Sequence, residues 1–186
     1  GHVNRPGNFE VPLGTPFASL LEMAGGVRDG RKLKAVIPGG SSVPVVHGAV
    51  MMDVNMDYDS VVKAGSMLGS GAIIVMDDTT CMVKVLERIS RFYFSESCGQ
   101  CTPCREGTGW LHRVVRRIEH GLGRPEDLAL LDQVASRMEG RTICALGDAA
   151  AMPVRSFVKQ FRDEFQYHVD HKRCLVGAPA PTLAVA

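Results

Sequence analysis

The sequence lacks any long apolar segment and any recognisable targeting signal. Its longest clean apolar run is Ala72 to Met76, far short of the roughly 20 residues that a membrane-spanning helix needs. No basic-then-apolar segment followed by a cleavage site stands at the start, so nothing indicates secretion. We therefore expect a cytoplasmic chain that does not itself span a membrane.

The sequence also lacks a strong charge of either sign and any obvious catalytic set. Its formal net charge is +1 over 186 residues, which gives no indication of nucleic-acid binding. No Ser/His/Asp combination and no paired carboxylates occur in a pattern that indicates bond-breaking chemistry. With 45% hydrophobic and 22% charged residues, the composition is that of an ordinary globular protein.

The first part of the chain contains no cysteine, because all six lie beyond residue 80. Residues 1–78 carry six Lys and Arg against eight Asp and Glu, whereas the remainder carries 15 against 12. This shift in composition predicts a domain boundary after residue 78. We expect one domain over 1–78, a second over 79–176, and a disordered tail over 177–186, where two prolines follow a glycine.

Short apolar runs separated by turn signals make up the first domain. A helix is predicted over Phe17 to Met23, where Gly25 and Gly26 end it. Strands are predicted over 33–37, 43–46 and 72–76. Helix and strand together indicate a small α+β unit.

The second domain changes to the three- and four-residue spacing of amphipathic helices. Helices are predicted over 79–94, 105–120, 125 to about 138, and 148 or 149 to 169. In the second of these, Trp110 is expected to face inward and His112 to lie on an exposed face. Four helices joined by short loops predict an antiparallel bundle.

Three cysteines fall in a Cys98-x-x-Cys101-x-x-Cys104 pattern, and Cys144 follows after 39 intervening residues. Two-residue gaps allow one tight loop to direct successive thiolates at a common centre, and the loop N–H groups can donate hydrogen bonds to cluster sulfurs. Three closely spaced cysteines with one remote cysteine are typical of a [4Fe–4S] site. We therefore predict that these four cysteines ligate one such cluster.

Other interpretations of the cysteines remain open at this point. Structural zinc usually takes two CxxC pairs, and a redox thiol pair needs no third or fourth cysteine. Disulfides are disfavoured in a cytosolic, helix-rich chain. Cys81 and Cys174 have no cysteine at a matching gap, so we expect both to be small buried or bystander residues.

The cysteine loop, read over residues 96–108 as ESCGQCTPCREGT, resembles the flavoprotein (NADH-binding) subunit of respiratory complex I, NADH:quinone oxidoreductase. The segment TICALGD at 142–148 fits the same family, as do GNFEVP at 7–12 and IPGGSS at 37–42. Related subunits occur in NAD-reducing hydrogenases and NAD-dependent formate dehydrogenases. The resemblance covers the chain up to about Val176 and implies a β-grasp domain followed by a four-helix bundle that binds the cluster.

In that family, NADH reduces FMN, and single electrons then pass to a [4Fe–4S] cluster and on to clusters in neighbouring subunits. The resemblance therefore implies Cys98, Cys101, Cys104 and Cys144 as ligands, and a 2Fe–2S subunit and a large iron–sulfur subunit as partners. It also implies a location on the cytoplasmic side, peripheral to the inner membrane. A diaphorase subunit of a hydrogenase or formate dehydrogenase is one alternative, and a zinc-stapled interaction module is another.

The family's N-terminal flavin and nicotinamide domain has no counterpart in these 186 residues. No residue here can therefore be assigned to FMN or NADH, and no catalytic residue is predicted. Since the chain begins at Gly1 and reads at once as ordinary domain sequence, we expect it to be part of a longer protein or to have a processed start. A split gene, with the flavin domain on a separate chain, is the alternative. Alone, the chain should not oxidise NADH.

Overall fold

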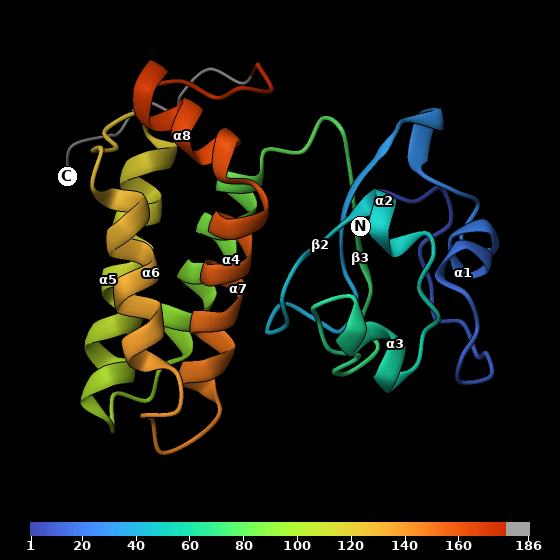
Figure 1. Cartoon of the computed structure of the whole chain (residues 1–186), viewed down its shortest axis with the longest axis horizontal. Coiled ribbons are helices and arrows are strands. Elements are labelled where there is room, and N and C mark those ends of the chain that lie inside the picture. Colours follow the sequence, from blue (N-terminus) through green and yellow to red (C-terminus); the bar gives the residue numbers. More distant parts are fainter. Residues whose placement is uncertain (178–186) are drawn as a thin grey trace. The chain divides into compact units, whose positions relative to one another are not determined.

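The computed structural model describes residues 1–177, which form two compact units (Figure 1). The first unit comprises Gly1–Thr80 and the second begins at Cys81. Of the tail predicted over 177–186, all but Gly177 lies outside the described residues. The α+β class is confirmed: a small antiparallel sheet belongs to the first unit, and the second is helical.

The sheet of the first unit has three strands in the order β2-β1-β3. The central strand β1 (Leu33–Ile37) pairs antiparallel with β2 (Val46–His47) and with β3 (Ile74–Asp77). Strand β2 is shorter than the strand predicted over 43–46, and it begins only at Val46, the last residue of that predicted strand. Pro44 cannot take part in the ladder as a donor, because it has no N–H. A bulge interrupts the β1–β3 register between Leu33 and Ala35.

Four short helical segments accompany the sheet. These are α1 (Phe17–Met23), the 3-10 turn η1 (Arg28–Gly30), α2 (Gly48–Met51) and α3 (Tyr58–Lys63). Helix α1 has the predicted bounds, and its Phe17 packs in the core with Val36 and Met51. Helix α3 was not predicted, although Asp57 caps it by accepting a hydrogen bond from the Ser60 N–H at 2.7 Å.

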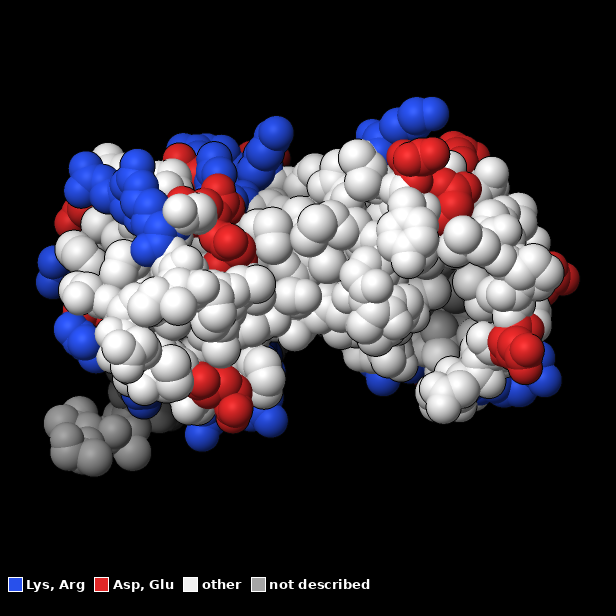
Figure 2. Space-filling view, turned by 90° about the horizontal axis from the view of Figure 1, so that it is seen from below, with Lys and Arg blue, Asp and Glu red and all other residues white. Residues whose placement is uncertain are grey.

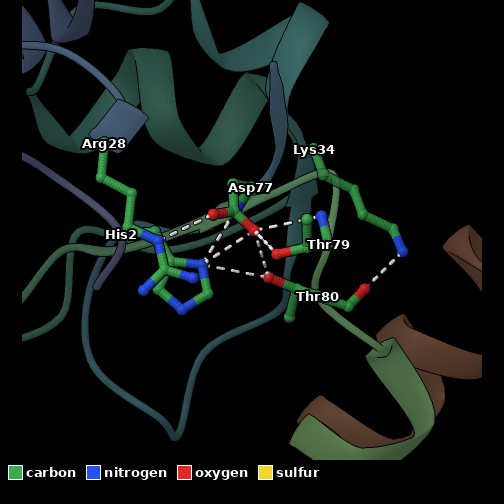
Figure 3. A network of polar contacts seen from close by, with 6 residues as sticks. All are labelled: His2, Arg28, Lys34, Asp77, Thr79 and Thr80. Carbon is green, nitrogen blue, oxygen red and sulfur yellow. Dashed lines mark hydrogen bonds and ion pairs between the residues drawn. The ribbon is translucent and has the colours of Figure 1, made fainter. Parts of the chain in front are cut away.

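A buried carboxylate, Asp77, ties the end of β3 to the start of the chain (Figure 3). Arg28 Nε and His2 Nδ1 each lie 3.0 Å from its oxygens, and the Thr79 hydroxyl donates to it at 2.7 Å. Burial alone would raise the pKa of Asp77, but these hydrogen bonds, from Thr79 foremost, hold it well below its ordinary range. Asp77 therefore stays ionised and joins three separate segments of the unit.

The second unit is built from helices α4 (Met82–Glu96), α5 (Thr102–Glu119), α6 (Asp127–Met138), α7 (Leu146–Gln160) and α8 (Arg162–His171). Helix α4 packs on α5, α5 on α6, α6 on α7, and α7 back on α4, which closes a four-helix bundle (Figure 1). Leu86, Leu111, Leu131 and Phe157, one from each of these helices, are fully buried. Helix α8 packs on α4, α5 and α7 at one end.

Several details of the helices differ from the prediction. Helix α5 begins three residues early, because Pro103 is tolerated in a first helical turn. The predicted helix over 148–169 is two helices, α7 and α8, separated at Phe161. Trp110 is 48% exposed, whereas His112 is only 8% exposed, so both orientations were predicted wrongly. His112 is held inward by Glu87 of α4, whose Oε1 lies 3.2 Å from its Nε2.

The up-and-down topology places alternate connections at opposite ends of the bundle. The α4–α5 and α6–α7 connections lie at one end, and the start of α4, the end of α5 and helix α8 lie at the other (Figure 1). We call these the loop end and the α8 end. No helix within residues 1–177 is both long and apolar enough to cross a bilayer.

Candidate metal centre

All four predicted cysteine ligands lie at the loop end, in the connections or in the first turn of the helix that follows. Cys98 is exposed in the α4–α5 connection, and Cys101 is the residue that precedes the first turn of α5. Cys104 is buried within that turn, and Cys144 is exposed in the α6–α7 connection. Two turns that are 39 residues apart in the sequence therefore present the four thiols at one end of the bundle.

The thiols lie near enough to one another to interact electrostatically. Burial raises the pKa of Cys104, and the negative charges of Cys101, Cys144 and Cys98 raise it further, while a hydrogen bond with Ser97 lowers it. A cationic centre between these sulfurs would offset the burial and the repulsion and would stabilise their thiolate forms. Iron in a cluster would supply that positive charge.

Local contacts fix the loop that carries the first three cysteines. Gly99 has a φ of 76°, in the left-handed region that favours glycine. Arg105 Nη1 donates to the Gly99 carbonyl at 3.1 Å, which holds the turn against the start of α5. The Ser97 hydroxyl lies 3.2 Å from Sγ of Cys104, within reach of a hydrogen bond to sulfur.

Short-range hydrogen bonds also fix the connection that carries Cys144. The Thr142 hydroxyl donates to the Cys144 carbonyl at 2.8 Å, and the Gly140 N–H donates to Asp148 at 2.7 Å. At Gly147 there is no room for a Cβ atom, which would clash with the Thr142 side chain. The short segment between α6 and α7 therefore has a defined shape that directs Cys144.

The helices at this end add favourable electrostatics. Cys101 and Cys104 stand at the N-terminus of the 18-residue helix α5, and Cys144 lies just before the N-terminus of the 15-residue helix α7. Helix N-termini carry partial positive charge and stabilise nearby anions. A cluster with four thiolates is anionic, so this donor set and its surroundings fit it.

The spacing of the sulfurs argues against a single ion at the loop end. A tetrahedral zinc site with Zn–S bonds of about 2.3 Å needs sulfurs about 3.8 Å apart. Within residues 1–177, no three of Cys98, Cys101, Cys104 and Cys144 have sulfurs within 4.8 Å of one another. In a [4Fe–4S] cluster each thiolate binds a different iron, so the thiolates stand farther apart.

A second group of potential ligands occurs at the α8 end, where none was predicted. Cys81, His168 and Cys174 have ligating atoms within 4.8 Å of one another, and Glu119 lies beside them. The sequence could not reveal this group, because its members come from four different segments with no motif spacing. Cys81 and Cys174 were expected to be small buried or bystander residues; Cys81 is indeed buried, and the structure places both beside His168.

The comparisons with known proteins agree with the resemblance. Residues 84–168 match the family described as the NADH-ubiquinone oxidoreductase-F iron-sulfur binding region, and residues 1–46 match the SLBB domain. The second of two NADH-quinone oxidoreductase F subunits of Rhizobium meliloti (strain 1021) is 51% identical over 175 residues, 94% of this chain and 41% of that protein. The NADH-quinone oxidoreductase F subunit of Mycobacterium bovis is 49% identical over 94% of this chain and 39% of its own length.

A solved structure shares the fold. A chain of an NAD+-reducing [NiFe]-hydrogenase in the H2-reduced state superposes with a TM-score of 0.81 at 25% identity, over 91% of this chain and 28% of that one. The chain thus spans about 40% of the length of the relatives that it matches in sequence. The resemblance stated from the cysteine loop is confirmed.

Proposed function

Because this chain belongs to the family of NADH-quinone oxidoreductase F subunits, whose C-terminal portion it matches, we propose that it relays single electrons through one [4Fe–4S] cluster. The observation that carries the proposal is the meeting of four thiols, from two connections, at the N-termini of α5 and α7. The match of residues 84–168 to an iron–sulfur binding region supports it.

We assign the cluster to Cys98, Cys101, Cys104 and Cys144. When bound, the cluster would supply one-electron redox chemistry. The protein sets its geometry, and the buried Cys104, Ser97 and the turn at Gly99 tune its surroundings. Solvent exposure and hydrogen bonds to sulfur are the means by which a protein adjusts a cluster's potential.

In the whole protein, we propose that NADH reduces FMN on a flavin domain outside these 186 residues and that electrons reach this cluster from the flavin. No residue of this chain is assigned to FMN or to NADH. The reaction is therefore that of an NADH dehydrogenase, and this chain alone supplies only the electron-transfer portion. The names of the relatives support this role, since they are subunits of NADH-quinone oxidoreductases.

We also propose partner subunits at the loop end. Cys98 and Cys144 are exposed, and Ile143 beside Cys144 is 76% exposed, an unusual position for a large aliphatic residue next to a redox centre. Seen from this side in Figure 2, uncharged residues occupy the middle of the helical unit, and Lys, Arg, Asp and Glu gather toward its margin. Such a surface suits a protein partner.

The proposed partners are the 2Fe–2S subunit and the large iron–sulfur subunit of the complex, toward which the electron would pass. The proposed location is cytoplasmic, peripheral on the inner membrane as part of that complex. A diaphorase subunit of a hydrogenase or formate dehydrogenase would use the same cluster. The diaphorase role is less favoured, because this chain shares 25% sequence identity with the hydrogenase chain but 51% with an NADH-quinone oxidoreductase F subunit.

The proposal is tested on the full-length protein that contains this chain, purified without oxygen and reconstituted with iron and sulfide. About four irons and four sulfides per chain are expected, with a spin-½ EPR signal at low temperature after reduction. Cys101→Ala should lose iron, sulfide and signal together. Absence of sulfide and of any such signal in the unmodified protein would overturn the proposal.

A further inference from the structure

We propose that Cys81, His168 and Cys174 bind a zinc ion at the α8 end of the bundle, with Glu119 as the fourth ligand. These residues come from the start of α4, the end of α5, helix α8 and the segment that follows it. All belong to the second unit. The site is separate from the four cysteines at the loop end and does not depend on the cluster assignment.

The distances between the donor atoms suit tetrahedral coordination. Sγ of Cys81 lies 3.5 Å from Nε2 of His168 and 4.0 Å from Oε2 of Glu119, and those two atoms are 3.9 Å apart. Sγ of Cys174 completes a group within 4.8 Å of Cys81 and His168. Donors around zinc stand about 3.3 to 3.8 Å apart, so Cys81 and His168 are already in place. Glu119, which lies outside the 4.8 Å group because of its distance from Cys174, and Cys174 itself would each have to move inward by about 0.5 Å or more.

His168 is held in the orientation and tautomer that a metal ligand requires. Its Nδ1 lies 2.8 Å from the carbonyl oxygen of Glu164, one helical turn earlier. Because a carbonyl can only accept, Nδ1 carries the proton and Nε2 presents its lone pair toward Cys81. The side chain is fully buried, which fixes the ring.

Cys81 stands where a thiolate is stabilised once a cation is present. It is the N-cap of the 15-residue helix α4, and the Lys84 N–H donates to its sulfur at 3.4 Å. Cys81 and Glu119 are both buried acidic groups, and a divalent cation bound between them would compensate their negative charge.

The donor set selects zinc among the divalent metals. Two thiolates and an imidazole are soft and borderline ligands, which favour zinc over magnesium or calcium. Binding would release the two thiol protons to solvent and leave zinc neutralised by two thiolates, with Glu119 adding one negative charge. Since the four ligands close the helical unit at the end opposite the cluster, the site is structural: it fastens α8 and the following segment to α4 and α5.

A direct test measures zinc in the full-length, cluster-loaded protein and in its Cys174→Ala variant. Cys174 lies beyond the last helix and is only partly buried, so its replacement should leave the fold and the iron content intact. The unmodified protein should bind one more zinc per chain than the variant, whose affinity at this site should fall on the order of 100-fold or more.

The matched control is His171→Gln, which replaces an exposed histidine one turn from His168 and should retain the zinc. Cobalt gives the second readout: added to the cluster-loaded protein, it should produce thiolate-to-metal absorption that Cys174→Ala and Glu119→Gln weaken. Equal zinc in the unmodified and Cys174→Ala proteins would overturn the proposal. So would a disulfide between Cys81 and Cys174 in protein isolated from cells, with no zinc bound after reduction.

Discussion

The two ends of the helical bundle contain similar ligands that are assembled in different ways. At the loop end, three cysteines occupy seven consecutive residues and a fourth lies in the next connection on the same side. At the α8 end, Cys81 and His168 meet although they are 87 positions apart in the sequence. The first arrangement is encoded by local spacing, and the second exists only because the helices pack.

This difference explains what the sequence could reveal. A ligand set within a single turn leaves a motif, since the loop must have Gly99 at a left-handed position and cysteines at fixed gaps. A set assembled from helix ends leaves no spacing to recognise. Metal sites of the second kind are found only after the fold is known, which is why the spacing of Cys81 and Cys174 predicted no common site.

The largest expected effect is the loss of the cluster in Cys144→Ala. This variant removes the one ligand that the α6–α7 connection contributes, so three thiolates remain for four irons. Iron and sulfide should fall from about four per chain to well below that, and the reduced EPR signal should disappear. Ile143→Ala, which alters the adjacent exposed side chain, should keep the cluster; its loss there would instead indicate general sensitivity of the connection.

The next effect should reach both ends of the bundle. Phe157 is fully buried on α7 between the four helices, so Phe157→Ala should destabilise the helical unit by about 3–5 kcal/mol, measured by denaturant unfolding. The cluster iron and the zinc should then be released at a lower denaturant concentration than in the unmodified protein. Phe92→Ala on α4 is the control, because Phe92 is half exposed, and it should cost far less. Equal losses in the two variants would contradict the assigned core.

The first unit offers a contrast in which no metal is involved. Asp77→Asn should lower its unfolding free energy by about 2 kcal/mol at neutral pH, because the charged hydrogen bonds to Arg28 and His2 are weakened. Asp78→Asn, at the exposed neighbouring position, should have little effect. Neither variant should change iron or zinc content.

The same carboxylate predicts a pH dependence. The pKa of Asp77 in the folded protein lies below its ordinary value near 3.8, so the stabilisation is fully present above about pH 4. As the pH falls below that value, the unfolded chain takes up the proton first, and the stabilisation declines. Unfolding of the unmodified protein should therefore become easier as the pH falls from about 4 toward about 2, and Asp77→Asn should show a smaller change over that range.

The smallest effect is expected on the bundle surface. Arg155 of α7 forms ion pairs with Asp132 in α6 and with Glu139, the C-cap residue of α6. Its Nε lies 3.1 Å from the Asp132 carboxylate. Exposed ion pairs contribute about 0–1 kcal/mol, so Arg155→Ala should lower stability by no more than that and should leave both metal sites unchanged. Raising the salt concentration should reduce even this difference. A loss of several kcal/mol would show that the pairs matter more than their exposure suggests.

Much of the fold could be predicted from the sequence. Helix α1 and strand β1 have the predicted bounds, since glycines and a Pro-Gly-Gly turn mark their ends. The helical bundle could be predicted because four segments have the apolar spacing of amphipathic helices and are joined by short connections. The wrong predictions concern features that depend on contacts between helices. His112 turns inward because Glu87 of α4 lies beside it. The helix predicted over 148–169 is interrupted at Phe161, a buried residue.

The most direct test of the two-ended bundle is a parallel measurement of iron, sulfide and zinc in the full-length protein, in Cys101→Ala and in Cys174→Ala. We expect Cys101→Ala to lose iron and sulfide but to keep its zinc at the α8 end. We expect Cys174→Ala to keep about four irons and four sulfides and to lose one zinc. If Cys101→Ala left the iron in place, the ligand assignment at the loop end would be contradicted. If Cys174→Ala kept its zinc or lost its iron, the assignment at the α8 end would be contradicted.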